Sequence, residues 1–301
     1  MPDNPDSAEE QAAVGVGRFP KWLHRKMPSQ TTLWSTKEVM RNKRLATVCE
    51  EAKCPNLIEC WSQGTATFLA MGHACTRNCG FCDIDFSATP QPLEVDEPQR
   101  VAESVKELGL KHVVITMVAR DDLADGGASH LVEIMKAIRQ QTPHVTIELL
   151  TSDFAGNLNA VDLVLQEQPH IFNHNIETVR SLTPRVRHKA TYDRTLAILQ
   201  HARKNEKALI KSGIMVGLGE TQEEVHGTLG DLHRAGCHIV TIGHYLQSSQ
   251  RKLRVKNFVT PEQFQAYADY GHSLGIPFVY SGPFVRSSYN AASVFDKLAI
   301  K

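Results

Sequence analysis

Short apolar runs alternate with amphipathic stretches along most of this chain, and this alternation limits the folds that the chain can adopt. The runs are rich in β-branched residues, as strands are, while the stretches between them have a helical period. In PQRVAESVKELGL, for example, Val101, Val105 and Leu108 share one face. Six such βα units with right-handed crossovers predict a parallel sheet closed into a barrel or a partial barrel. The expected strands are TATFLAM (65–71), HVVITMV (112–118), VTIELL (145–150), HIFNHNI (170–176), LIKSGIMVG (209–217) and HIVTIGHYL (238–246).

The predicted fold class is therefore α/β, a partial (β/α)6 TIM-like barrel with N-terminal and C-terminal extensions. The barrel is expected over residues 65–275, and residues 18–64, which lack a sustained period, form an extension packed on it. Residues 1–17 carry four acidic side chains and no apolar run, so we expect a disordered tail. Residues 276–301 form the C-terminal extension. It begins with a seventh strand candidate, IPFVYSG, and the sequence leaves open whether this run joins the sheet.

The charge balance narrows the classes of partner. Lys and Arg number 33 and Asp and Glu also number 33 in a chain of 301 residues, so no net field attracts nucleic acid or an anionic membrane. No window approaches the roughly 18 to 20 apolar residues that cross a bilayer, and the N-terminus resembles no targeting signal. We expect a cytoplasmic protein with no nucleic-acid or membrane partner.

Cysteines are crowded into one part of the chain. Six of the seven lie between residues 49 and 82, a pattern that indicates metal or redox chemistry rather than a disulfide framework. The segment CTRNCGFC places Cys75, Cys79 and Cys82 directly after the first expected strand, at the mouth of the barrel. A zinc site here would have to recruit His73 or a distant fourth ligand. A four-iron cluster would instead have one ligand for each of three irons and leave the fourth iron open for a reaction partner.

This C-x3-C-x2-C motif, with Phe81 before its last cysteine, resembles the radical S-adenosylmethionine superfamily. The resemblance implies a 4Fe-4S cluster on Cys75, Cys79 and Cys82, whose open iron is chelated by S-adenosylmethionine. It also implies a 5'-deoxyadenosyl radical that removes hydrogen from unactivated carbon. No side-chain base has this reactivity, because proton transfer needs matched pKa values.

A second triplet lies upstream in TVCEEAKCPNLIECW, where Cys49, Cys54 and Cys60 follow a C-x4-C-x5-C spacing. Buried structural thiols are the alternative, because a free cysteine often behaves as a small apolar residue. Two three-cysteine sets so close together favour a second cluster, again one ligand short.

With further motifs, the chain resembles the lipoyl synthase family from about residue 18 to residue 295. The motifs are the two cysteine segments, RDDLADGGA, NHNIETV, SGIMVGLGET and GPFVRSSY. The resemblance implies that Ser288 closes the auxiliary cluster and that Arg286 and Ser288 are catalytic. It implies that this cluster is consumed to insert two sulfur atoms at C6 and C8 of an octanoyl chain on a carrier lysine, at one S-adenosylmethionine per C–H bond. Without the two triplets, Ser287 and Ser288 would be ordinary turn residues after Pro283.

The same resemblance implies the partners. They are octanoylated lipoyl carrier domains, namely 2-oxoacid dehydrogenase E2 subunits and the glycine cleavage H protein, and an electron donor such as ferredoxin or flavodoxin. Two other functions stay open: another dual-cluster radical enzyme that inserts sulfur or methylthiolates, and a non-enzymatic cluster-binding module. The basic runs 185–194 and 250–256 are either solvated faces or a docking surface for an acidic carrier domain.

Further polar residues follow the expected strands, where they are placed to reach the barrel mouth. Buried polar groups need partners, which S-adenosylmethionine would supply, although core hydrogen bonds or a helix cap are the alternatives. An inward lysine within a strand needs a ligand or a carboxylate. The candidate cofactor-binding residues are Phe81, Arg120, Asn173, Asn175, Glu177 and Lys211. Cys237, alone near a strand edge, is expected to be a buried structural thiol.

The chain departs from the family pattern at several positions. Met117 and Ala119 stand where the family has a serine and an acid in S-V-D-R-D-D-L. The segment GHYLQSSQRKLRV likewise replaces G-Q-Y-L-Q-P, with His244 and Ser248 at changed positions. Such changes fit a divergent or second copy with its own carrier preference.

Overall fold

The described strands of the main sheet run side by side in nearly the order of the sequence. The computed structural model describes residues 20–24, 33–62 and 67–288, so the expected tail and the second half of the C-terminal extension, residues 289–301, lie outside the described residues. Every neighbouring pair in the sheet is parallel except β1 with β2. The order is β1 (Ala46–Thr47), β2 (Thr67–Ala70), β5 (His112–Met117), β6 (Thr146–Leu150), β7 (Ile171–Asn173), β8 (Leu209–Val216), β9 (Ile239–His244) and β10 (Phe278–Gly282). The six predicted strands are all present, and the seventh run joins the sheet as β10.

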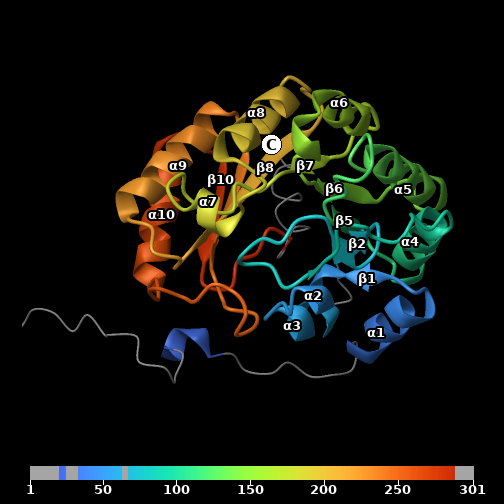
Figure 1. Ribbon diagram of the computed structural model, residues 1–301, viewed down its shortest axis with the longest axis horizontal. Coiled ribbons are helices and arrows are strands. Elements are labelled where there is room, and N and C mark those ends of the chain that lie inside the picture. Colours follow the sequence, from blue (N-terminus) through green and yellow to red (C-terminus); the bar gives the residue numbers. More distant parts are fainter. Residues whose placement is uncertain (1–19, 25–32, 63–66, 289–301) are drawn as a thin grey trace, which may run out of the picture.

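Helices follow the strands and form an outer arc around them (Figure 1). Their apolar faces pack inward as expected, with Val101 and Val105 fully buried and Leu108 partly buried. Threonine caps begin several helices, and at Thr221 the capping box with Glu224 is complete. None of the described helices is long and apolar enough to cross a membrane. The arc contains α4 (Glu97–Glu107), α5 (Ala128–Gln141), α6 (Leu158–Gln166), α8 (Tyr192–Arg203), α9 (Gln222–Arg234) and α10 (Pro261–Ser273).

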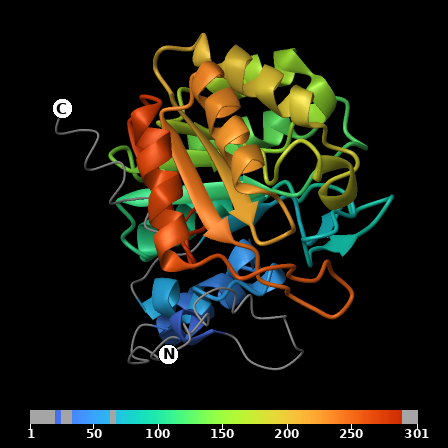
Figure 2. The same cartoon turned by 90° about the vertical axis from the view of Figure 1, so that its left-hand side faces the viewer.

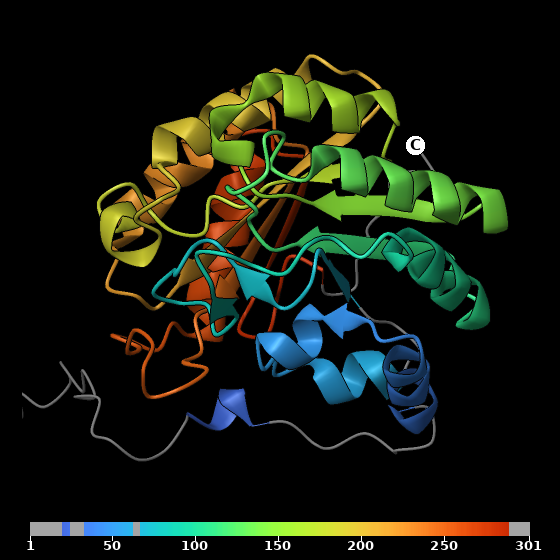
Figure 3. The ribbon, with the colours of Figure 1, turned by 45° about the vertical axis from the view of Figure 1, so that its right-hand side comes forward.

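The sheet does not close: β2 and β10 have no parallel partner on their outer sides among the described residues. The N-terminal segment lies at this opening, as Figures 1 and 3 show. It is attached at both edges, since β1 pairs with β2 and the Asn56 side chain donates to the Phe284 carbonyl just after β10, at 2.8 Å. The segment contains α1 (Leu33–Asn42), α2 (Val48–Glu51) and α3 (Leu57–Ser62).

Short elements lie in the loops at the carboxyl ends of the strands (Figure 2). They are β3 (Ala74–Cys75), β4 (Asp85–Phe86), the 3-10 turn η2 (Phe154–Gly156) and α7 (Thr183–Val186). A further 3-10 turn, η1 (Lys21–Leu23), precedes the N-terminal helices.

A buried ionic layer crosses the interior of the barrel. Lys211 Nζ lies 2.9 Å from Glu148 Oε1, and both side chains are almost fully buried. Asn173 donates to the same carboxylate at 2.8 Å, and the His112 ring lies 3.7 Å from it. Burial alone would raise the pKa of Glu148, but Lys211 and His112 outweigh it and hold the pKa below its usual value.

We expect Lys211→Met to lower the free energy of unfolding by about 3–5 kcal/mol, because it leaves the Glu148 carboxylate buried without its cation. The double variant Lys211→Met/Glu148→Gln removes that charge and keeps an acceptor for Asn173, so it should regain most of the loss. Chemical denaturation of the cluster-free proteins measures both. Additive losses in the double variant would contradict the pairing.

Candidate active site

A cavity of about 580 Å³ opens at the carboxyl ends of the strands. Its wall includes residues of β5, β6, β8 and β9, of the loops that follow them, and of the N-terminal and C-terminal segments. Residues expected from the sequence form a large part of this wall: Cys54, Cys75, Cys79, Phe81, Cys82, Asn175, Glu177, Arg286 and Ser288.

The first cysteine triplet lies together on this wall. Cys75 ends β3, and its sulfur accepts from the backbone N–H groups of Arg77 and Ala119 at 3.4 and 3.3 Å. The rest of the loop is held at Gly80, whose N–H donates to the Val186 carbonyl and whose carbonyl accepts from the Leu253 N–H. Two distant loops therefore fix the position of the triplet.

Two thiols of this triplet, Cys79 and Cys82, are buried enough to be neutral when free. Burial raises the pKa of Cys79 to about 11 and that of Cys82 to about 12. Two cations, Arg187 and Arg77, act in the opposite direction at Cys79. A thiolate-bound cluster is anionic, so a low-dielectric wall that carries guanidinium groups fits such a group.

Arg77 lies between the cysteines in sequence and is buried in an ionic network. Its guanidinium donates to Asp121 at 2.6 and 2.8 Å and lies 2.6 Å from Asp153, which Arg194 approaches at 3.2 Å. Burial alone would raise the pKa of Asp153, but Arg77 outweighs it and keeps the pKa below its usual value. Both aspartates are therefore ionised around neutral pH and help to hold the loop.

Arg187 joins the triplet to the residues after β7. Its side chain is buried and donates to the Asn175 carbonyl at 2.6 Å. Asn175 in turn donates to Glu177 at 3.0 Å. Desolvation raises the pKa of Glu177, although Arg187 and Asn175 oppose the shift. No local signal in the sequence marks Arg187, because it lies in a basic run that resembles a solvated face.

The second triplet is spread over α2, α3 and the turn between them. The Cys54 N–H donates to the Cys49 carbonyl and the Cys60 N–H to the Asn56 carbonyl, so local backbone bonds arrange all three cysteines. Cys54 lines the cavity, while Cys49 is buried, with its pKa raised to about 11 by burial, and Cys60 packs against the core. Asn56 ties this turn to Phe284, two residues before Arg286.

Three of the six candidate cofactor-binding residues lie elsewhere. Asn173 and Lys211 contact Glu148 one layer nearer the amino ends of the strands than the cavity wall. Arg120 is buried against Asp122, at 2.8 Å, and the Met71 carbonyl. The structure supplies each with a protein partner, so a role in cofactor binding stays a prediction for these three. Asn175 and Gly213, two residues further along from Asn173 and Lys211, do line the cavity.

The geometry does not favour a single zinc ion. Within residues 20–24, 33–62 and 67–288, no three His, Cys, Asp or Glu side chains are close enough to share one ion. A four-iron cluster gives each cysteine its own iron and so keeps the sulfurs apart. His73, the expected fourth zinc ligand, pairs with Glu51 at 2.8 Å and does not line the cavity. Cys237 is a buried thiol in the core, as predicted.

The positions that depart from the family pattern all belong to the cavity wall. Met117, Ala119, His244 and Ser248 line it. His244 accepts from the Val259 N–H at 3.2 Å and donates to the Tyr245 carbonyl at 2.6 Å, so its ring is fixed by backbone. These substitutions therefore change the surface that a bound molecule would meet.

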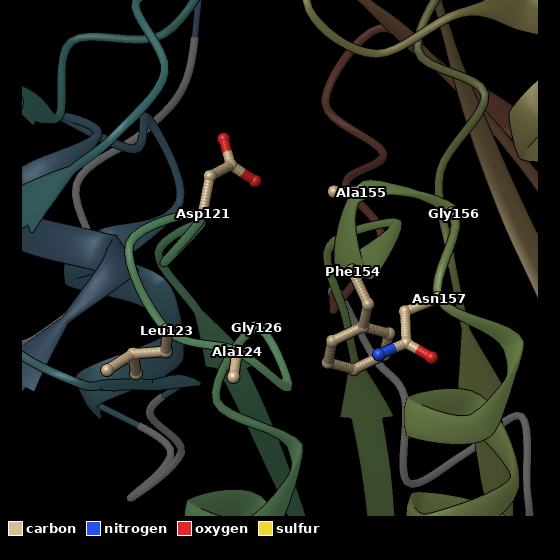
Figure 4. Close-up of a pocket in the computed structure, with 8 residues that line it drawn as sticks. All are labelled: Asp121, Leu123, Ala124, Gly126, Phe154, Ala155, Gly156 and Asn157. Atoms are coloured by element: carbon tan, nitrogen blue, oxygen red, sulfur yellow. The ribbon is translucent and has the colours of Figure 1, made fainter.

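A second cavity of about 460 Å³ lies between the loops that follow β5 and β6 (Figure 4). It is lined by small and apolar side chains such as Leu123, Ala124 and Phe154. Its two polar side chains are engaged elsewhere, Asp121 with Arg77 and Asn157 with the N-terminus of α6. It offers no group of its own for chemistry.

Comparison with known proteins agrees with this site. Residues 69–232 match the radical SAM superfamily. The lipoyl synthase of Protochlamydia amoebophila (strain UWE25) is 64% identical over 294 residues, which cover 97% of this chain and 91% of that protein. The lipoyl synthase of Chlamydia trachomatis serovar L2 is 56% identical over 282 residues, 93% of this chain and 90% of that protein.

Solved structures share the fold at low identity. The hydrogenase maturase HydG superimposes with a TM-score of 0.56 at 15% identity, covering 85% of this chain and 63% of HydG. SuiB of Streptococcus suis bound to S-adenosylmethionine gives a TM-score of 0.55 at 11% identity, covering 75% of this chain and 55% of SuiB. The partial barrel is therefore the fold of radical SAM enzymes, and the chain belongs to the lipoyl synthase family, whose members are sulfur-inserting transferases of the radical SAM superfamily.

Proposed function

We propose that this enzyme inserts two sulfur atoms at C6 and C8 of an octanoyl chain attached to a lysine of a lipoyl carrier domain, giving the lipoyl group. One observation carries the proposal: the first triplet, Cys54 of the second triplet and residues 286–288 all line one cavity. A radical source and a sulfur source would then face the same bound chain.

We assign a separate set of ligand residues to each iron-sulfur cluster. Cys75, Cys79 and Cys82 hold the 4Fe-4S cluster that binds S-adenosylmethionine, and Cys49, Cys54 and Cys60 with Ser288 hold the auxiliary one. When bound, the first cluster would supply the electron that cleaves S-adenosylmethionine to methionine and the 5'-deoxyadenosyl radical, and the second would supply sulfur. A serine oxygen is a harder ligand for iron than a thiolate, so it suits a cluster that is meant to be taken apart.

The protein's own residues bind, orient and exclude water. Arg187 and Arg77 neutralise negative charge at the first triplet, and Asn175 and Glu177 offer an amide and a carboxyl group to the amino acid and ribose portions of S-adenosylmethionine. Met117, Leu150 and Val285 give the cavity an apolar wall that fits an octanoyl chain. Burial of the reacting carbons away from water protects a radical from side reactions.

The carrier domain needs a place to dock, and the cavity mouth has a basic surface. The two basic runs meet there, because both bond to Gly80. Among the described residues, no carboxylate pairs with their exposed cations, although Lys189 donates to the Thr76 carbonyl. We call the exposed basic side chains of the two runs the basic rim: Arg185, His188, Lys189, Arg251, Arg254 and Lys256. An acidic face on an E2 lipoyl domain or on a glycine cleavage H protein would complement it.

The cellular setting follows from the same chemistry. All seven cysteines are free thiols, and six of them must stay reduced to hold clusters, which suits the cytoplasm. The radical step consumes an electron, so a small reductant such as ferredoxin or flavodoxin must also reach the protein.

The test of this function is a mass-spectrometric assay. Anaerobically purified protein with S-adenosylmethionine and a reductant should convert an octanoylated carrier domain to a product that carries two sulfur atoms. Iron and sulfide analysis should find about eight irons per chain, as two four-iron clusters require. A methylthiolated product, or 5'-deoxyadenosine with no sulfur transfer from the wild-type protein, would overturn the proposal in favour of another dual-cluster enzyme.

Two alanine variants should separate the roles of the clusters. Ser288→Ala leaves S-adenosylmethionine cleavage within about twofold of wild type but lowers sulfur insertion by about 10²-fold or more, on the scale of losing one essential group. Cys79→Ala abolishes the cleavage itself, because it removes a ligand of the radical-generating cluster. High-performance chromatography of 5'-deoxyadenosine and mass spectrometry of the carrier give the two readouts. Equal loss of both activities in Ser288→Ala contradicts separate roles.

Charge reversal should test the basic rim. We expect Arg251→Glu/Arg254→Glu to slow association with the carrier domain roughly tenfold and to weaken its dependence on salt, since rim charges act mainly on the on-rate. Surface plasmon resonance at two salt concentrations measures this. Lys204→Glu/Lys207→Glu is the matched control. These exposed lysines precede β8 and so lie at the amino ends of the strands, on the side away from the cavity. Equal effects of the two pairs would show that net charge alone is responsible.

A further inference from the structure

The segment from Pro283 to Ser288 passes along the barrel wall and is fastened at three points. The His244 N–H donates to the Pro283 carbonyl at 3.3 Å, and the Val285 N–H donates back to the Gly282 carbonyl at 3.1 Å. The Phe284 carbonyl accepts from Asn56. All six residues are half-buried. The segment therefore follows a defined path between β9 and the turn of the second triplet.

Two glycines leave the room for this path. A side chain at Gly243 would place its Cβ 2.0 Å from the Val285 carbonyl oxygen, so only glycine lets the segment lie against β9. A Cβ at Gly213 on β8 would come within 2.7 Å of Thr241 Oγ1, 2.8 Å of Asn175 Oδ1 and 3.0 Å of Ser287 Oγ. Real Cβ contacts are almost never shorter than about 3.0 Å, so a side chain at Gly243 would force the segment to move. One at Gly213 would displace the Thr241 and Asn175 side chains and crowd Ser287.

The two adjacent serines face different surroundings. Ser287 Oγ lies 2.7 Å from the Asn175 amide nitrogen and 2.9 Å from its amide oxygen, so it is hydrogen-bonded to the barrel. Asn175 is itself held by Glu177 and by Arg187. Ser288 lines the cavity, and no residue that the structure describes hydrogen-bonds to its side chain.

We propose that Ser287 is a positioning residue: its bond to Asn175, above Gly213, fixes the segment so that the Ser288 hydroxyl is presented to the second cysteine triplet. This proposal rests on the proposed function, in which Ser288 is a cluster ligand. An oxygen ligand binds iron weakly compared with a thiolate. Ordering a loose residue costs backbone entropy, so a weak ligand is effective only where the fold has already ordered it.

The proposal also gives a reason for two serines in sequence. The contact of Ser287 is with protein atoms only, so it holds the segment in place whether or not Ser288 is bonded to iron. The ligand position then stays in reach of a newly assembled cluster after the previous one has been used.

The decisive measurement is the stability of the auxiliary cluster by itself. In a Cys75→Ala/Cys79→Ala/Cys82→Ala background the other cluster is absent, and loss of iron to a chelator can be followed by absorbance. We expect Ser287→Ala to lose iron roughly five- to tenfold faster than the parent, as loss of one or two hydrogen bonds predicts. Gly213→Ala should accelerate the loss in the same way, because its Cβ displaces the same contact.

The matched control is Ser281→Ala. Ser281 lies on β10, and its buried hydroxyl has no hydrogen-bond partner among the described residues, so the same substitution should leave iron loss unchanged. Hydrogen exchange of the cluster-free proteins gives an independent readout. Ser287→Ala should speed exchange at residues 284–288, whereas Ser288→Ala should not.

Iron loss from Ser287→Ala at the parent rate, with fast loss from Ser288→Ala, would overturn this proposal and leave the proposed function intact. Complete failure of Ser287→Ala to assemble a cluster, with normal exchange at residues 284–288, would mark Ser287 as a ligand and would also overturn it. Four irons instead of eight in the wild-type protein would defeat the proposed function itself.

Discussion

The open side of the barrel is the constraint on which the rest of the structure depends. A sheet that stops before closing leaves two edge strands, β2 and β10, whose outer backbone groups and side chains need cover. Here β1 pairs with β2, and the turn of the second triplet is bonded through Asn56 to the segment after β10. The N-terminal segment that covers the open side thus also brings the second triplet to the cavity. One segment therefore both protects the sheet edges and positions the cysteines proposed to hold the second cluster.

Electrostatics explains why the cavity can accept anionic groups although the chain as a whole is neutral. Arg77 and Arg187 are buried at the wall, and each is held in place by partners on other elements. Arg77 is matched by two carboxylates, Asp121 and Asp153, so its charge is largely balanced. Among the described residues, Arg187 forms no ion pair as close as those of Arg77; Glu177, whose pKa is raised by desolvation, and Asp153 act on it electrostatically. The less balanced positive potential therefore lies on the Arg187 side of the triplet.

The sequence predicted the features that depend on local pattern. Strand positions followed from apolar periodicity, and the first triplet was placed correctly at the barrel mouth because it directly follows a strand. Features set by long-range contacts were missed. Burial of Arg187 depends on its bond to Asn175, and no local signal separates it from its exposed neighbour Arg185. Asn173 and Lys211 lie on expected strands near the site, and the sequence does not show that Glu148, more than 20 residues away from either, faces them.

The direction of side chains along a strand explains which polar residues reach the site. Asn173 and Asn175 both point inward from the end of β7, yet they differ by one layer of the barrel, about 6 to 7 Å along the strand. The deeper layer is closed by the Glu148 carboxylate, and only the shallower one borders the cavity. An ionic layer beneath the cavity floor fixes the strands from which Asn175 and Gly213 project. The position of the Asn175 to Ser287 hydrogen bond therefore depends on Lys211 and Glu148, which lie below the cavity and do not line it.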